Sequence, residues 1–177
     1  MEPLSLILFR HAKSDWHAEY GQDDRQRPLS PRGCRAARTM GRFLANAGQV
    51  PRVAMTSPAV RARRTLELAI GAGGWSCEVQ VRPGLYGEAA ELLAEIHAAP
   101  SDSRTLVLVG HEPAWSTGAQ LLTGAGRIRL PTASMLRLEL DADRWRDVGP
   151  ATATITWLMV PRLAERARGR SRQGRYN

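Results

Sequence analysis

The segment TLVLVGHEP, residues 105–113, places an unbroken apolar run directly before a glycine, a histidine and a proline. A short run of this kind predicts a buried strand over Thr105–Val109. The N-terminal run Leu4–Phe9 has the same character and leads into Arg10-His11. Two predicted strands therefore each end next to a histidine. In open α/β sheets, this end of the strands is where ligands bind.

Strands and helices alternate along most of the chain. Short apolar or β-branched runs predict strands over Leu4–Phe9, Arg52–Thr56, Cys77–Val81, Thr105–Val109, Ser134–Leu140 and Thr152–Met159. Capping residues and apolar periodicity predict helices after Ser30-Pro31, after Ser57-Pro58, over Glu88–Ala98 and over Pro113–Leu122. We expect an α/β fold: a three-layer sandwich whose mostly parallel sheet has helices on both faces. The last two strands have no helix between them and are expected to form an antiparallel hairpin.

Much of the positive charge lies at the C-terminal end. The formal net charge is +8, and six arginines fall in residues 162–177, which have few apolar positions. We predict a domain over residues 1–161 and a flexible Arg-rich tail over residues 162–177. Such a tail can contact anionic surfaces nonspecifically. No apolar run approaches a membrane span, and Cys34 and Cys77 form no disulfide framework, so we expect a reduced, cytoplasmic protein.

Motifs for several other chemistries are missing. The sequence has no Walker P-loop, no dinucleotide-binding glycine motif after the first strand and no nucleophile elbow. A metal site is disfavoured as well. Asp15 and Glu112 lie near the two histidines in the sequence, but the neighbouring arginines would repel a cation. We therefore predict a site that uses neither a metal nor another cofactor.

Three arginines are expected near the two strand-end histidines. Arg10 adjoins His11, Arg27 precedes the first predicted helix, and Arg61 lies in the first turn of the second. Guanidinium groups bind phosphate oxygens bidentately, and a helix N-terminus adds backbone donors. A neutral imidazole between such groups can attack phosphorus and hold it as phosphohistidine. These residues predict a covalent phosphoryl-transfer site.

The motifs together resemble those of the histidine phosphatase superfamily. The resemblance rests on Arg10-His11 after the first strand, Ser57-Pro58-x-x-Arg61-Ala62-x-x-Thr65, and Gly110-His111 after a later strand. The usual Arg-His-Gly is Arg-His-Ala here. Within the superfamily, the chain is similar to the small branch typified by the bacterial phosphohistidine phosphatase SixA. That similarity rests on the segments RHAKSDW at 10–16, DRQRPLSPRG at 24–33 and Leu85-Tyr86.

The resemblance implies a phosphoglycerate mutase-like fold and a role for each matching residue. His11 matches the nucleophile, and Arg10 and Arg61 match arginines of the phosphate pocket. His111 matches the second pocket histidine, and Arg27 matches a further phosphate-contacting arginine of the small branch. The general acid is left open between Glu112, Glu88 and no dedicated residue.

We therefore predict a metal-independent phosphatase that works through phosphohistidine on His11. Its expected substrate is a phosphorylated protein, with phosphohistidine favoured because the short chain lacks long insertions over the site. One alternative is a phosphomonoesterase of the same superfamily that acts on a small phosphorylated metabolite. The other, from a different class, is a basic module that binds nucleic acid or an anionic surface through its tail.

Overall fold

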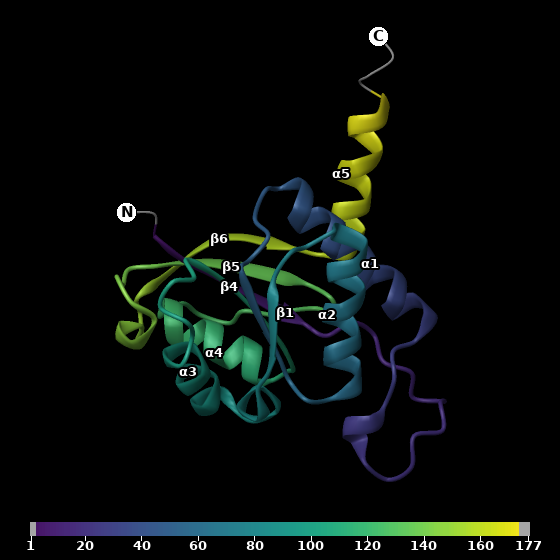
Figure 1. Ribbon diagram of the computed structural model, residues 1–177, viewed down its shortest axis with the longest axis horizontal. Helices are drawn as coiled ribbons and strands as arrows, with labels where there is room; N and C mark the ends of the chain where they lie inside the picture. Colours follow the sequence, from purple (N-terminus) through teal and green to yellow (C-terminus); the bar gives the residue numbers. More distant parts are fainter. Residues whose placement is uncertain (1–2, 174–177) are drawn as a thin grey trace.

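The computed structural model describes residues 3–173 and contains a six-stranded sheet in the order β3-β2-β4-β1-β5-β6 (Figure 1). The strands are β1 (Leu4–Arg10), β2 (Val53–Thr56), β3 (Glu78–Val81), β4 (Thr105–Gly110), β5 (Met135–Leu140) and β6 (Ala153–Met159). Strands β3, β2, β4 and β1 run parallel, whereas β5 and β6 are antiparallel additions beside β1. The predicted mostly parallel sheet and C-terminal hairpin are confirmed.

Helices cover both faces of the sheet. They are α1 (Pro31–Asn46), α2 (Val60–Gly73), α3 (Ala89–His97), α4 (Ala114–Thr123) and α5 (Pro161–Gln173). Alternate side chains of a strand point to opposite faces. Accordingly, Leu6 and Leu8 of β1 belong to the core cluster that includes α3 and α4, and Ile7 and Phe9 to the one that includes α1 and α2. The three-layer α/β sandwich is confirmed.

The start of α1 is held close to the loop that follows β1. The Ser30 side chain caps the helix by accepting a hydrogen bond from the Gly33 N–H at 3.1 Å, as the Ser-Pro pattern predicts. The Ser30 N–H also donates to the Lys13 carbonyl at 2.9 Å. A Cβ on Gly33 would lie 2.1 Å from that carbonyl oxygen, so only glycine permits this approach. These contacts hold the N-terminus of α1 against Lys13, in the loop that follows β1.

The second Ser-Pro pattern is used differently from our prediction. Helix α2 begins at Val60, and its N-cap position is Ala59, without a side-chain cap. Ser57 lies too far upstream to cap it, and its Oγ instead accepts a hydrogen bond from the Ala59 N–H at 3.3 Å. The same Oγ lies 2.8 Å from His111 Nε2. Ser57 thus supports a histidine of the sheet edge rather than the helix.

Helix α5 spans most of the segment for which we predict a flexible tail, and a helix there was not expected; the flexibility of the segment stays a prediction. Ala164 is buried in the core cluster shared with α1, and Figure 1 shows the rest of α5 extending away from the sheet. Residues 174–177 lie outside the described residues, and the domain boundary at residue 161 stays a prediction. Within residues 3–173, no helix is both long and apolar enough to cross a membrane.

Candidate active site

The two strand-end histidines lie side by side. Strands β1 and β4 are parallel neighbours, with Arg10 paired to Gly110 in the register, so both deliver the next residue to the same edge. The ring centroids of His11 and His111 are 4.9 Å apart. They face a cleft of about 450 Å³. Its lining consists of Arg10, His11, Lys13, Ser14, Trp16, Asp24, Arg27, Arg61, Tyr86, His111, Glu112 and Thr132.

His11 is held as a neutral imidazole with a defined tautomer. Its Nδ1 lies 2.8 Å from the Ala12 carbonyl oxygen, which can only accept, so Nδ1 carries the proton. The lone pair of the neutral ring is therefore on Nε2. Burial lowers the pKa of His11 to about 4, with further lowering by nearby arginines, foremost Arg61, while the Ala12 hydrogen bond opposes the shift. At neutral pH, Nε2 has the lone pair that a nucleophile needs.

The segment around His11 is anchored to α2. The Ala12 N–H donates to Thr65 Oγ1 at 3.0 Å, and the Thr65 hydroxyl donates to the Arg61 carbonyl at 2.7 Å. Ala12 and Thr65 are fully buried. The threonine of the Ser57–Thr65 motif therefore ties the histidine loop to the helix that carries Arg61.

His111 is also neutral, and a hydrogen bond with Ser57 holds its ring in place. Burial, followed by the neighbouring His11 and Arg61, lowers its pKa to about 3. Its Nε2 bonds Ser57, while its Nδ1 is buried and has no hydrogen-bond partner among the described residues. Gly110, the preceding residue, packs against Trp115, and a Cβ at this position would lie 2.2 Å from the indole ring. The glycine therefore lets Trp115 pack against the backbone turn that positions His111.

All three predicted arginines reach the cleft. Arg27 and Arg61 are each 5% exposed, and Arg10 donates from Nη1 to the Leu130 carbonyl at 2.7 Å. The Nε atoms of Arg10 and Arg61 are buried without a partner among the described residues. Burial also lowers the pKa of Arg10. These unused donors suit an anion with several oxygens, such as a phosphoryl group.

Asp24 joins two of these arginines, a role that the sequence did not indicate. Its Oδ1 accepts from Arg27 Nε at 2.9 Å and its Oδ2 lies 3.0 Å from Arg61 Nη2. Its backbone carbonyl accepts from Arg61 Nη1 at 2.6 Å. The Arg27 hydrogen bond in particular lowers the pKa of the Asp24 carboxyl group. Asp24 remains an anion at neutral pH and fixes the orientation of both guanidinium groups.

Two aromatic side chains complete the walls of the cleft. The Arg27 guanidinium lies over the Trp16 ring, 3.5 Å from its centroid, and Trp16 is itself 60% exposed at the rim. Tyr86 meets His111 edge-on, with ring centroids 5.1 Å apart. The sequence motifs contained both residues, but only the structure shows that they border the two histidines.

The two candidate acids occupy different environments. Glu112 lines the cleft, and its carboxylate accepts from the Ser116 hydroxyl at 2.8 Å and the Ser116 N–H at 3.3 Å. Glu88 is absent from the lining, and instead caps α3 by accepting from the N–H of Glu91, whose carboxylate accepts in return from the Glu88 N–H. Of the two residues, the structure therefore brings only Glu112 to the site.

Comparisons with known proteins agree with this fold. The family model for the histidine phosphatase superfamily (branch 1) matches residues 6–88. An uncharacterised protein of Mycobacterium tuberculosis is 36% identical over 165 residues, which cover 86% of this chain and 99% of that protein. A protein of Nakamurella multipartita assigned as the phosphohistidine phosphatase SixA has a structure with a TM-score of 0.75 at 31% identity, over 91% of this chain and 98% of the other.

The chain belongs to the histidine phosphatase superfamily and is a phosphatase. Its fold is also that of a mycobacterial glucosyl-3-phosphoglycerate phosphatase, with a TM-score of 0.64 at 16% identity, over 87% of this chain and 98% of the other. At that identity, the likeness concerns the fold alone. The relatives thus include proteins named for different phosphorylated substrates.

Proposed function

We propose that the protein removes phosphoryl groups by forming a covalent phosphohistidine on His11, and that its substrate is phosphohistidine on a protein. The observation that carries the first part is the hydrogen bond from His11 Nδ1 to the Ala12 carbonyl, which leaves the lone pair on Nε2. Buried arginines beside this nitrogen supply donors for the phosphoryl oxygens.

The reaction proceeds in two displacements. In the first, the Nε2 lone pair of His11 forms a bond to phosphorus, and the bond from phosphorus to the leaving group breaks. The leaving atom takes the electron pair. In the second, water attacks the phosphorus, the bond to Nε2 breaks and inorganic phosphate leaves with the protons of the water. Arg10, Arg27 and Arg61 neutralise the phosphoryl oxygens in both steps.

The preference for phosphohistidine follows from the leaving group. An imidazole nitrogen leaves readily when the other ring nitrogen is protonated, whereas an alkyl oxygen needs a proton from a general acid. In this site, the Glu112 carboxylate is engaged as the acceptor of two hydrogen bonds from Ser116, and Glu88 lies at the start of α3. Substrates that do not need an acid are therefore favoured.

A small phosphomonoester is the second candidate substrate, and the position of Glu112 favours it. This carboxyl group borders the cleft that contains His11 and would serve as the acid if it gave up its contact with Ser116. An acid of this kind contributes about 10²–10⁴-fold to a step with a poor leaving group.

Turnover of a matched substrate panel separates the two candidates. The panel contains a phosphohistidine peptide, an aryl phosphate, sugar phosphates and nucleotides, each assayed with the wild-type enzyme, Glu112→Gln and Glu88→Gln. We expect fast turnover of the phosphohistidine peptide and the aryl phosphate, slow turnover of alkyl phosphates, and little effect of either substitution. Fast alkyl turnover that falls in Glu112→Gln but not in Glu88→Gln would establish the second candidate.

A further inference from the structure

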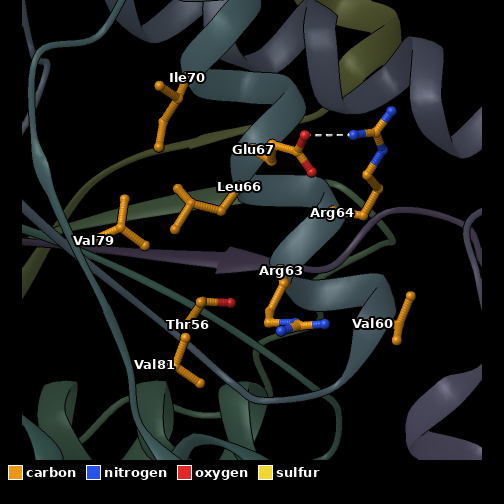
Figure 2. Close-up of a pocket in the computed structure, with 9 residues that line it drawn as sticks. All are labelled: Thr56, Val60, Arg63, Arg64, Leu66, Glu67, Ile70, Val79 and Val81. Carbon is orange, nitrogen blue, oxygen red and sulfur yellow. Dashed lines mark hydrogen bonds and ion pairs between the residues drawn. The ribbon is translucent and has the colours of Figure 1, made fainter.

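A second hollow lies between α2 and β3, away from the two histidines. Figure 2 shows its lining, in which apolar side chains from the helix face those of the strand. The hollow has a volume of about 500 Å³, and its lining residues are Thr56, Val60, Arg63, Arg64, Leu66, Glu67, Ile70, Val79 and Val81. Val79 and Val81, on the same face of one strand, are 47% and 49% exposed, so two apolar side chains stand side by side in water.

Strand β3 is an edge strand with one free side. It is last in the sheet order and pairs with β2 alone among the described strands. The N–H groups of Glu78 and Arg82 donate to the carbonyls of Arg52 and Thr56, so the even-numbered residues face β2. Because hydrogen-bonding direction alternates along a strand, Val79 and Val81 direct their N–H and C=O groups outward. Outward N–H and C=O groups of this kind are a template for another strand, although the strand is short and is followed by Pro83.

We propose that this edge binds a second copy of the same chain, with β3 antiparallel to β3 of the second copy and a two-fold axis at Gln80. Val79 then lies opposite Val81 of the second copy, and Val81 lies opposite Val79 of the second copy. Both are hydrogen-bonded pairs, so the outward N–H and C=O groups of all four valines are satisfied. The proposal does not depend on the substrate of the phosphatase.

The charges next to the valines favour a second copy as the occupant. In this register, Glu78 lies opposite Arg82 of the second copy, and the pair occurs twice. Arg82 Nε already donates to Glu95 of its own chain, so the Glu78 carboxylate would meet the Nη atoms of the same guanidinium. Opposite charges in directly opposed positions stabilise antiparallel strands. A shift by two residues in one direction places Glu78 opposite Gln80, and in the other it places Val79 opposite Pro83, which has no N–H to donate. The edge is therefore self-complementary in one register.

The hollow beside α2 supplies the apolar part of the contact. A two-fold axis perpendicular to the sheet brings both copies of α2 to the same face, above the four paired valines. Ile70 of α2 lines the hollow on that face and is partly exposed, whereas Leu66, one turn earlier, is only 1% exposed and already belongs to the core. The contact would cover an apolar patch that a monomer leaves in water.

Light scattering over a concentration series tests the association, and a cross-link tests the register. We expect twice the mass of one chain for the wild-type protein, and the mass of one chain for Val79→Lys. Leu158→Lys is the matched control, because Leu158 is 40% exposed on β6, at the opposite edge of the sheet. It should leave the dimer intact. Circular dichroism and turnover of an aryl phosphate verify that each variant is folded.

In a Cys34→Ser, Cys77→Ser background, Gln80→Cys should form an intermolecular disulfide on mild oxidation, because residue 80 faces itself across the axis. Val79→Cys should cross-link poorly, since its opposite residue is Val81. A monomer at every concentration would overturn the proposal. A dimer that persists in Val79→Lys, or that cross-links through residue 79 rather than residue 80, would overturn the proposed surface or register.

Discussion

The strongest electrostatic prediction concerns the protonation of His11. Burial places its pKa near 4, against an ordinary value of 6.5. Below pH 6.5 the unfolded imidazole takes up a proton, whereas the buried one stays neutral until about pH 4. The free energy of unfolding is therefore highest above pH 6.5 and decreases as the pH falls from 6.5 to about 4. At pH 4, the unfolded imidazole is almost fully protonated and the folded one is half protonated. Linkage then gives a loss of about 3 kcal/mol from this residue alone.

Two measurements test this value. Nuclear magnetic resonance of protein labelled in its histidine rings, with the His11 signal assigned from His11→Gln, should give a titration midpoint near pH 4. Urea unfolding at pH 7 and pH 4 should show a smaller loss of stability at pH 4 in His11→Gln than in the wild type, by about 3 kcal/mol. His111 is present in both proteins, so its own titration largely cancels. A midpoint near 6.5 with equal losses would refute the argument that burial keeps His11 neutral.

Three further predictions concern residues around the site and the C-terminal helix. Asp24→Asn should raise KM for an aryl phosphate more than it lowers kcat, because Arg27 and Arg61 lose the carboxylate that orients them; unchanged kinetics would contradict this positioning role. Gly110→Ala should destabilise the fold by about 1–3 kcal/mol in urea unfolding, since its Cβ would meet an indole ring; wild-type stability would contradict that packing. Ending the chain after residue 160 should lower the Tm by about 3 °C through the loss of one buried methyl group on α5, whereas ending it after residue 167 should leave the Tm unchanged.

The sequence predicted the sheet well because its strands are short apolar runs in a fixed alternation with helices. Leu106–Val109 and Leu4–Phe9 are both buried in the centre of the sheet, where apolar residues are required on both faces. It also indicated that the residues after these strands meet, since parallel neighbours end at one edge. That reasoning placed His11 and His111 together, 100 residues apart in the chain.

The contacts of Asp24 could not be predicted in the same way. Asp24 lies in an irregular polar segment, where no periodicity relates it to Arg61, and the ion pair between them spans 37 residues. Its spacing from Arg27 is the only local signal. Glu88 is a similar case: the sequence left it open as a possible acid, and only the structure shows that its carboxylate caps the N-terminus of α3.

Helix α5 was not predicted because the sequence analysis considered only how few apolar residues follow Pro161. A lack of apolar residues argues against burial, but a segment can still be helical when its residues have high helix propensity. Proline at the first helical position followed by Leu163, Ala164, Glu165 and Arg166 has high helix propensity. The buried contact at Ala164 involves a single methyl group, which the composition of the segment does not reveal.

The central claim is that phosphate passes through His11, and trapping the phosphorylated enzyme tests it most directly. The enzyme is mixed with an aryl phosphate, quenched during turnover without acid, and digested for mass spectrometry. The account predicts phosphate on His11 in the wild type, no label in His11→Ala, and turnover reduced by about 10³-fold or more in that variant. Phosphate on His111 instead, with His11→Ala still active, would contradict it.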